Sequence, residues 1–321
     1  MPLLNKTALL ASFALAVPLF SQEPQGDPVF STGVRLVQLH ATVVDAKGKL
    51  VINLPQSAFT VLENGKPQPL KLFRREDVPV SMGLIVDNSG SMRDKRAKVN
   101  QAALALVKAS NKEDEVFIVN FNDEAYLDRP FTNDIKKMEE ALTKIDSRGG
   151  TAMRDAVTMS IDYLKEKGKR DKKVLLVVTD GDDNTSAATN TMEKLVEKAQ
   201  QSEILVYTIG LLTEEERGKA KRATRALNAL AAATGGIAYF PKAVDDVEQL
   251  AVQVAHEIRN QYTMSYSPLE ASLDGSYRRI QVLAKGPGKL TVRTRSGYYA
   301  TPDQQAPKQK TAVPSANSLR P

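Results

Sequence analysis

The stretch that decides the fold runs from residue 80 to residue 92 and reads VSMGLIVDNSGSM. Its first eight residues are nearly all apolar and end at Asp87, a pattern typical of a strand buried on both faces of a parallel sheet. A helical pattern starts at Lys95, so the residues between them form a strand-to-helix loop. Asp87, Ser89 and Ser91 place three oxygen side chains at alternate positions, where an extended backbone can point them in one direction.

The same alternation of strand and helix continues on both sides of this stretch. Near-continuous apolar runs predict further strands at 115–121, 173–180 and 203–210, and a period of 3.6 predicts helices at 95–109, 135–145, 153–165, 192–200, 220–233 and 247–259. Alternating strands and helices indicate an α/β, Rossmann-like domain whose mainly parallel central sheet is flanked by helices. We assign this domain to residues 80–260. Ligands of such sheets bind at the carboxyl ends of the strands.

Two further polar residues fall at that edge of the sheet. Thr151 follows Gly149 and Gly150 at the start of a predicted helix, and Asp180 ends a strand just before Gly181. The chain has no cysteine and two histidines, which excludes thiol chemistry, disulfides and Cys/His zinc sites. Hard oxygen donors instead suit Mg²⁺, which has six ligands and usually keeps several waters. The residues therefore predict an oxygen-ligated metal site.

These motifs resemble the von Willebrand factor A domains and the integrin I-like domains. The metal-ion-dependent adhesion site (MIDAS) of that family is Asp-x-Ser-x-Ser, a distant Thr and a distant Asp, and here Asp87, Ser89, Ser91, Thr151 and Asp180 occur in that order. The resemblance implies that Ser89, Ser91 and, in the ligand-competent state, Thr151 bind Mg²⁺ directly, with Mn²⁺ or Ca²⁺ as alternatives. It implies that Asp87 and Asp180 act largely through water, and that a Glu or Asp of a partner protein completes the coordination.

The flanks of the central domain carry short alternating runs separated by turn residues, which predict β segments at 29–75 and 261–300. Neither segment is expected to bury a hydrophobic face alone, so we expect the two to pair into one small β-sandwich-like unit. The phrases VVDAKGKLVINLPQSAFTVLENGK and QYTMSYSPLEASLDGSYRRIQVLAKGPGKLTVRTRSGYYA in these flanks resemble a bacterial, acidobacterial-type branch of the family.

The ends of the chain indicate export. Residues 1–21 have a short positive start and an apolar run, which is typical of a secretory signal peptide cleaved after Ser21 or Ala16. Retention of this run as an anchor is the alternative, and membrane association is expected only in that case. We therefore predict a secreted or periplasmic protein. Residues 301–321 are rich in Pro, Gln, Ser and Lys and are expected to be disordered.

Several other polar residues have a plainer interpretation. Asp182 and Asn184 continue a calcium-loop-like spacing from Asp180, but Thr185 stands where an EF-hand needs Gly, so we interpret Asp182 and Asp183 as charges at the rim of the site.

The histidines and two methionines are also open to a structural interpretation. His40 and His256 lie far from the motif in sequence and are expected to be structural. Met92 and Met153 stand next to the metal residues in sequence and either line an apolar rim or pack beneath the loops.

The formal net charge of +6 permits an anionic partner. Basic clusters occur at 165–173 and 217–225, but they lack interleaved aromatic residues, so we expect solvated helix ends and no nucleic acid partner.

Three classes of function compete for this pattern. The favoured one is a non-enzymatic, metal-dependent protein-binding or adhesion module, and the alternative is an envelope-assembly scaffold that uses the central domain for subunit contacts. A metal-dependent hydrolase is less favoured. A phosphoryl-transfer aspartate of the haloacid dehalogenase kind would need a second Asp where Ser89 stands, and the motifs Gly-x-Ser-x-Gly and Gly-Lys-Ser/Thr are absent from the sequence.

Overall fold

A computed structural model describes residues 36–75, 77–143, 147–212 and 217–301. These residues belong to one compact unit, Val34–Pro321. The predicted signal peptide, the first residues of the predicted β segment at 29–75 and the predicted tail from residue 302 onward lie outside the described residues.

The central sheet has the predicted α/β architecture. Its six strands lie in the order β10-β9-β8-β5-β6-β7. Their bounds are β5 (Val80–Asp87), β6 (Glu115–Phe121), β7 (Ala125–Thr132), β8 (Lys172–Thr179), β9 (Leu205–Gly210) and β10 (Ala238–Tyr239). All neighbouring pairs are parallel except β6 and β7, which are antiparallel. The mainly parallel, Rossmann-like sheet predicted from the apolar runs is confirmed.

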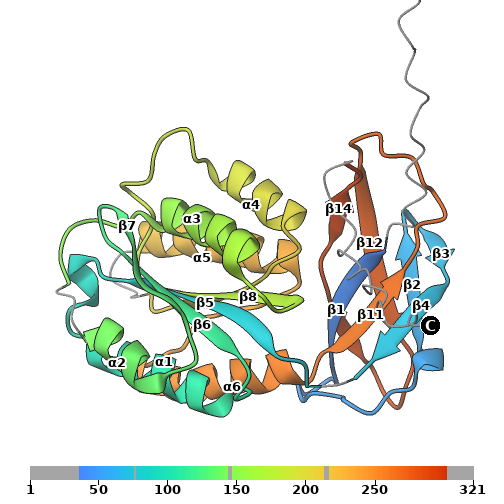
Figure 1. Ribbon diagram of the computed structural model, residues 1–321, viewed down its shortest axis with the longest axis horizontal. Helices are drawn as coiled ribbons and strands as arrows, with labels where there is room; N and C mark the ends of the chain where they lie inside the picture. Colours follow the sequence, from blue (N-terminus) through green and yellow to red (C-terminus); the bar gives the residue numbers. More distant parts are fainter. Residues whose placement is uncertain (1–35, 76, 144–146, 213–216, 302–321) are drawn as a thin grey trace, which may run out of the picture. The chain divides into compact units, whose positions relative to one another are not determined.

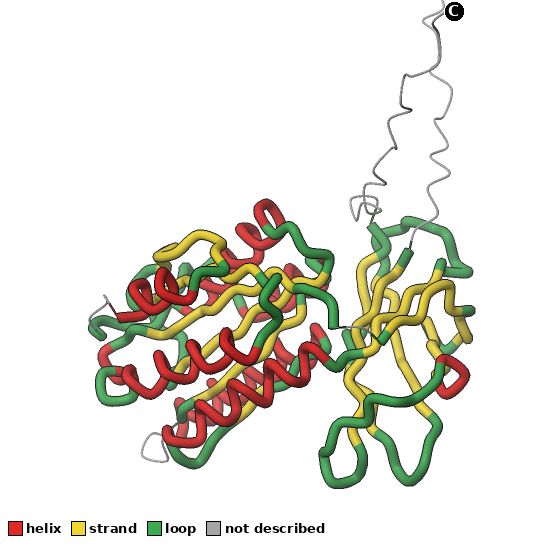
Figure 2. Tube along the Cα trace, turned by 60° about the horizontal axis from the view of Figure 1, so that its bottom comes forward, coloured by secondary structure: helices red, strands yellow, loops and turns green. Residues whose placement is uncertain are grey.

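Helices cover both faces of this sheet. One face carries α1, α2 and α6, and the other carries α3, α4 and α5 (Figures 1 and 2). Their bounds are α1 (Arg96–Ala109), α2 (Ile135–Thr143), α3 (Met153–Lys167), α4 (Met192–Gln201), α5 (Arg217–Thr234) and α6 (Val247–Arg259), with short 3₁₀ turns η1 (Gln56–Ala58), η2 (Gly90–Met92) and η4 (Val244–Asp246).

The two faces of β5 explain why its sequence is apolar throughout. Met82, Leu84 and Val86 pack into the core beneath α1 and α6, and Ile85 packs into the other core beneath α3 and α5. All eight residues of β5 are buried. A strand with helices on both sides cannot show polar alternation, and the only polar residue of β5 before Asp87 is the buried Ser81.

The two edge strands of the sheet were not predicted. β7 reads AYLDRPFT and is half-exposed along most of its length, so its sequence lacks the apolar run of a central strand. β10 is two residues long and follows Gly235, whose φ of +91° ends α5. A Cβ on Gly235 would lie 2.6 Å from the backbone nitrogen of Arg295, so the turn and the close approach both require glycine.

The two flanks of the chain form a β-sandwich, which confirms this part of the predicted fold. One sheet has the order β13-β1-β11-β4 and the other β14-β12-β2-β3, with one hydrophobic core contributed by both flanks. The strands are β1 (Val37–Val44), β2 (Phe59–Glu63), β3 (Lys66–Gln68), β4 (Leu70–Arg74), β11 (Tyr262–Tyr266), β12 (Tyr277–Ala284), β13 (Thr291–Arg293) and β14 (Gly297–Tyr299). Strands from the two flanks pair directly, β1 with β11 and β2 with β12.

A buried polar cluster joins α6 to the sandwich. The Glu257 carboxylate, 3% exposed, accepts from the hydroxyl of Thr42 on β1 at 3.3 Å and from the Arg293 guanidinium of β13 at 2.6 Å. It also accepts from Tyr207 at 3.1 Å and Tyr239 at 3.3 Å, both in the central domain. One carboxylate therefore holds elements of both domains.

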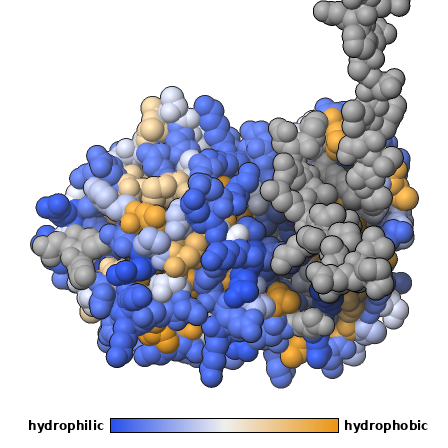
Figure 3. Space-filling view, viewed as in Figure 1, coloured by the Kyte–Doolittle hydropathy of each residue, from blue (hydrophilic) through white to orange (hydrophobic). Residues whose placement is uncertain are grey.

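The chain passes between the two domains at neighbouring places. It enters the central domain after β4 and leaves it after α6, where Arg259 pairs with Asp77 through an Nε–Oδ2 distance of 2.8 Å. Within the described residues, no helix is long and apolar enough to cross a membrane. The face drawn in Figure 3 is mostly hydrophilic, with hydrophobic residues scattered across it.

Candidate metal site

The predicted site residues lie where the topology changes direction. After β5 the chain forms β6 next to one edge of β5, and later it forms β8 next to the other edge of β5. The carboxyl ends of β5 and β8 therefore flank a topological switch point. Such a point is where ligands bind in open α/β sheets. Asp87 is the last residue of β5, and Asp180 directly follows β8.

Asp87 is held rigidly from two sides. Its side chain is fully buried, Oδ1 accepts from the Ser89 amide at 2.7 Å and Oδ2 accepts from the Thr179 hydroxyl at 2.5 Å. Burial raises the pKa of this carboxyl to about 6, and the Asp180 carboxylate adds to the rise, while the hydrogen bonds from Thr179 and Ser89 oppose it. Burial, more than any neighbouring charge, is therefore the main cause of the raised pKa of Asp87.

Ser89, Ser91 and Asp180 form a continuous chain of oxygens. The two serine hydroxyl oxygens are 3.1 Å apart, and the Ser91 hydroxyl donates to Asp180 Oδ1 at 2.8 Å. Ser89 is buried and Ser91 is exposed, so the chain runs from the interior to the surface. A hydroxyl that donates its proton to a carboxylate keeps its lone pairs for a cation. This geometry is compatible with the predicted ligand roles.

The other oxygen of Asp180 has a partner that the sequence analysis missed. The Lys95 ammonium pairs with Asp180 Oδ2, and the side chains are 18% and 1% exposed. The next residue, Arg96, is also turned inward, and its guanidinium donates to the Asp87 carbonyl at 3.3 Å and to Asn120 Oδ1 at 2.9 Å. The signal in the sequence is a pair of basic residues where α1 begins, a place that favours acidic ones.

Thr151 lies beside the other site residues. A Cβ on Gly181 would stand 3.3 Å from Thr151 Oγ1, so glycine after Asp180 lets the threonine hydroxyl approach this edge. The loop before Thr151 is joined to the first one, because the Gly90 amide donates to the Gly149 carbonyl at 3.2 Å. The structure thus brings Asp87, Ser89, Ser91 and Asp180 into one hydrogen-bonded set and places Thr151 next to Gly181.

The backbone of Thr151 is clamped by one residue of the β8–α4 loop. The side-chain oxygen Oδ1 of Asn184 accepts from the backbone amide of Thr151 at 2.8 Å, and the backbone amide of Asn184 donates to the Thr151 carbonyl at 3.0 Å. We call this pair of bonds the Asn184 clamp. Asp123 holds the preceding glycines, since its Oδ1 accepts from the Gly150 amide at 2.7 Å. The sequence analysis did not single out Asp123, and it used Asn184 only as part of a spacing.

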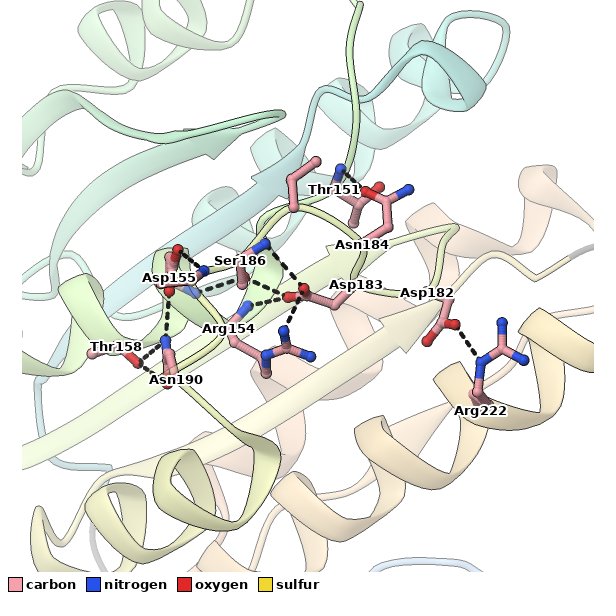
Figure 4. A network of polar contacts seen from close by, with 12 residues as sticks. Thr151, Arg154, Asp155, Thr158, Asp182, Asp183, Asn184, Ser186, Asn190 and Arg222 are labelled. Atoms are coloured by element: carbon pink, nitrogen blue, oxygen red, sulfur yellow. Dashed lines mark hydrogen bonds and ion pairs between the residues drawn. The ribbon is translucent and has the colours of Figure 1, made fainter.

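Figure 4 shows how the clamp is supported. Asp183 accepts from the Arg154 amide at 2.7 Å and pairs with its guanidinium at 3.1 Å, and it also accepts from the Ser186 hydroxyl at 2.7 Å. Asp155 accepts from the Asn190 side chain at 2.7 Å. Through these bonds the start of α3 and the β8–α4 loop form one network. Asp183, with a side chain 4% exposed, is part of it and is not a charge at the rim, whereas Asp182, 22% exposed, pairs with Arg222 at 2.6 Å.

The two methionines and His40 have structural roles. Met92 and Met153 are buried in the two cores, so they pack beneath the loops and do not line an apolar rim. His40 contacts Thr263 at 3.2 Å within the sandwich, and burial lowers its pKa well below the usual value. His256 is exposed on α6.

The residues present fit a hard divalent cation by the chemistry of their donors. Two carboxylates and the Ser89 and Ser91 hydroxyls lie in one hydrogen-bonded set with Thr151 next to Gly181, and hard oxygen ligands are what Mg²⁺ and Mn²⁺ take in proteins. Among the described residues there is no group of three or more His, Cys, Asp or Glu side chains that could hold a metal. A metal at this site would therefore depend on hydroxyl ligands as well as on carboxylates. Next to it, neither polar atom of the buried Asn88 side chain has a hydrogen-bond partner among the described residues, so an additional polar group could be accommodated beside this loop.

Comparisons with known proteins agree with the resemblance. The family model described as von Willebrand factor type A domain matches residues 82–183. Inter-alpha-trypsin inhibitor heavy chain H4 is 24% identical over 147 residues in Bos taurus and 28% identical over 147 residues in Sus scrofa. Each match covers 41% of this chain and 16% of the relative, so the chain spans a small part of the length of these proteins.

Several solved structures are similar to this chain at low sequence identity. A von Willebrand factor type A protein from Catenulispora acidiphila is 12% identical, with a TM-score of 0.49 and coverage of 85% of this chain and 76% of that one. The conserved hypothetical protein BatB from Bacteroides thetaiotaomicron is 18% identical, with a TM-score of 0.46 and coverage of 56% of this chain and 98% of that one.

Proposed function

Because the chain contains a von Willebrand factor type A domain, we propose that it is a non-enzymatic protein-binding module that captures a partner's acidic side chain through a bound Mg²⁺. Asp87, Ser89, Ser91, Thr151 and Asp180 would hold the ion. Mn²⁺ or Ca²⁺ could replace it, since both take oxygen ligands. The partner is a protein that presents Glu or Asp, and the place of action is the cell exterior or the periplasm.

One observation carries this proposal. The Ser89 and Ser91 hydroxyls stand 3.1 Å apart at the switch point, and Ser91 directs its proton to Asp180. Both serine oxygens can thereby offer lone pairs to one cation. Serine and threonine bring no formal charge to the ion, so it stays electrophilic and attracts a carboxylate from outside.

The chain's own residues perform the remaining work. Asp87 is fixed by Thr179 and the Ser89 amide, and it can orient water on the ion because both of its oxygens are held in place. The Asn184 clamp fixes Thr151, and Arg96 ties the end of β5 to β6 through Asn120. When bound, the cation supplies the Lewis acidity that attracts the partner's carboxylate.

Calorimetric titration of Mg²⁺ and of Mn²⁺ into the protein tests the site. The wild type should bind one ion, and Asp87→Asn should bind none, because the substitution removes charge and keeps the shape. Asp94→Asn is the matched control, an exposed carboxylate three residues after Ser91, and should bind like the wild type. Equal binding by Asp87→Asn and wild type in folded protein would exclude this site.

A pull-down from native envelope extract, in Mg²⁺ and in EDTA, tests the partner class. Capture should depend on the metal and should be lost in Asp87→Asn. An envelope-assembly component as the captured protein would favour the scaffold alternative, and a matrix or surface protein would favour adhesion. Capture that persists in EDTA would contradict the metal-bridged mode.

A further inference from the structure

Lys95 stands inside the candidate site, although nothing in the predicted ligand set requires it. Its ammonium pairs with Asp180 Oδ2, while Ser91 occupies Oδ1 of the same carboxylate at 2.8 Å. Asp180 therefore has both oxygens occupied by donors from the β5–α1 loop. The Asp180 side chain is 1% exposed, so this pair is shielded from the solvent that normally screens surface ion pairs.

The backbone of Lys95 is fixed by hydrogen bonds, which restricts the positions that its ammonium group can take. The Lys95 amide donates to the Met92 carbonyl at 3.0 Å, and the Lys95 carbonyl accepts from the Lys98 and Val99 amides at 3.1 Å. Lys95 occupies the N-cap position of α1, and its side chain caps nothing there. A cation at this end of a helix opposes the helix dipole. Helix stability therefore does not account for a lysine here, whereas the pairing with Asp180 does.

The ammonium and a divalent ion make opposing demands on Asp180. Both are cations that gain energy from the same buried carboxylate, and two cations side by side repel each other strongly where water is excluded. Divalent binding therefore has to displace the ammonium from Asp180 or tolerate its charge nearby. In either case Lys95 weakens the binding of the ion.

The same charge has the opposite effect on the ligand of the ion. Asp87 and Asp180 together balance the two charges of a divalent cation, and the Arg96 guanidinium at the Asp87 carbonyl is positive as well. Lys95 adds one further positive charge to the loaded site, so a carboxylate from outside is attracted to it more strongly.

From these contacts, and on the basis of the function proposed above, we infer that Lys95 is a charge-setting residue that lowers the affinity of the site for divalent cations and raises the affinity of the loaded site for carboxylate anions. The protein would then hold its metal weakly when alone and firmly when a carboxylate ligand is present.

Titration of Mn²⁺ alone into the full chain tests the first half of this inference. Lys95→Met should bind Mn²⁺ at least tenfold more tightly than the wild type, and Lys95→Arg, which keeps the charge, should stay within threefold of it. Lys98→Met is the matched control, because Lys98 lies one turn further along α1 and pairs at the surface with Asp245. It should bind like the wild type.

Acetate is the probe for the second half. In protein saturated with Mn²⁺, acetate that displaces water from the ion lowers the water-proton relaxivity, and the midpoint of this change should shift to at least threefold higher acetate in Lys95→Met. Thermal unfolding in EDTA gives a separate readout. Lys95→Met leaves the buried Asp180 carboxylate with its hydrogen bond from Ser91 but without a counter-charge, so this variant should melt earlier than Lys95→Arg.

Equal or weaker Mn²⁺ binding by Lys95→Met, in protein with wild-type circular dichroism, would overturn the inference. Unchanged acetate binding in the same variant would overturn its second half. A different result, in which the wild type and every variant fail to bind Mn²⁺, would refute the metal site itself and the inference with it, so the two failures can be told apart.

Discussion

Replacement of Glu257 by glutamine should destabilise the protein more than any ordinary surface change. All four side-chain partners of the carboxylate are donors to it: Thr42, Tyr207, Tyr239 and Arg293. A glutamine of the same shape keeps one oxygen but turns an amide NH₂ toward some of these donors. The hydroxyls can rotate to accept from it, but the Arg293 guanidinium has no acceptor.

The expected magnitude follows from the burial of the pair. Breaking a buried ion pair by removing one partner costs about 3–5 kcal/mol, because the other charge stays buried without compensation. The Arg293 side chain is 23% exposed and can regain some hydration, which places the cost at the lower end, about 3 kcal/mol. For a domain of this size that corresponds to a fall in the melting temperature of roughly 6–12 °C.

Urea unfolding followed by circular dichroism, together with calorimetric melting, measures this change. Glu248→Gln is the matched control, an exposed glutamate on the same helix, and should change the free energy of unfolding by less than about 0.5 kcal/mol. The double variant with Arg293→Gln supplies a second check. Since the cost arises from the unpaired guanidinium, Glu257→Gln should cost much less in that background.

A loss below about 1 kcal/mol for Glu257→Gln would refute the reasoning, because it would show that water or a rearranged partner compensates Arg293. An equal loss in both backgrounds would locate the cost in the tyrosine and threonine hydrogen bonds, not in the ion pair.

Three further predictions concern other parts of the molecule. Gly149→Ala should lower the free energy of unfolding in urea by about 1–3 kcal/mol, because φ is +76° and the new Cβ would stand 2.2 Å from Asp123 Oδ2. Gly65→Ala is the control, at φ +79° with open space around it, and should lower it by about 1 kcal/mol. Equal losses would contradict the steric argument. Asn184→Ala should lose about 1–2 kcal/mol of stability and should bind Mn²⁺ more weakly in calorimetry. Asn184→Asp keeps an acceptor for the Thr151 amide and should lose less stability. Unaltered metal binding in both variants would show that the Asn184 clamp does not position the site. Burial lowers the pKa of Lys172 from 10.5 to about 7, so between these pH values the unfolded chain holds a proton that the folded chain has released. The free energy of unfolding should therefore rise with pH by up to about 1.4 kcal/mol per pH unit. Lys172→Met should flatten this rise in unfolding measured at pH 7 and pH 9.5, and an unchanged slope would assign the rise to other groups.

The sequence predicts the central strands well because their environment leaves a clear pattern. Both faces of β5 and β8 are covered, so the middle of each strand is apolar. Asp87 stands where β5 ends, and Asp180 directly follows β8. The edge strand β7 has no such pattern, since solvent covers part of it and residues such as Asp128 and Arg129 are tolerated there.

The candidate site was predictable as far as its loops go. Side chains at the ends of adjacent parallel strands must meet, and this brings Asp87 to Asp180 without knowledge of any contact. Lys95 and Asn184 could not be predicted in the same way, because whether a lysine turns inward or an amide reaches another loop depends on partners far away in the sequence. Asp183 was misjudged for that reason, because it lies in the β8–α4 loop and its partner Arg154 lies on α3.

The contact between Asp77 and Arg259, at the two places where the chain crosses between the domains, has a consequence for protein design. The central domain begins and ends at neighbouring points, so it is joined to the sandwich by two adjacent chain crossings. A domain joined in this way can be replaced without a change in the strand order of the other domain. β4 and β11 pair as antiparallel neighbours, with Arg74 opposite Thr263. A short turn in place of residues 78–260 would therefore join them as a hairpin, and the sandwich without its central domain is a natural target for protein design.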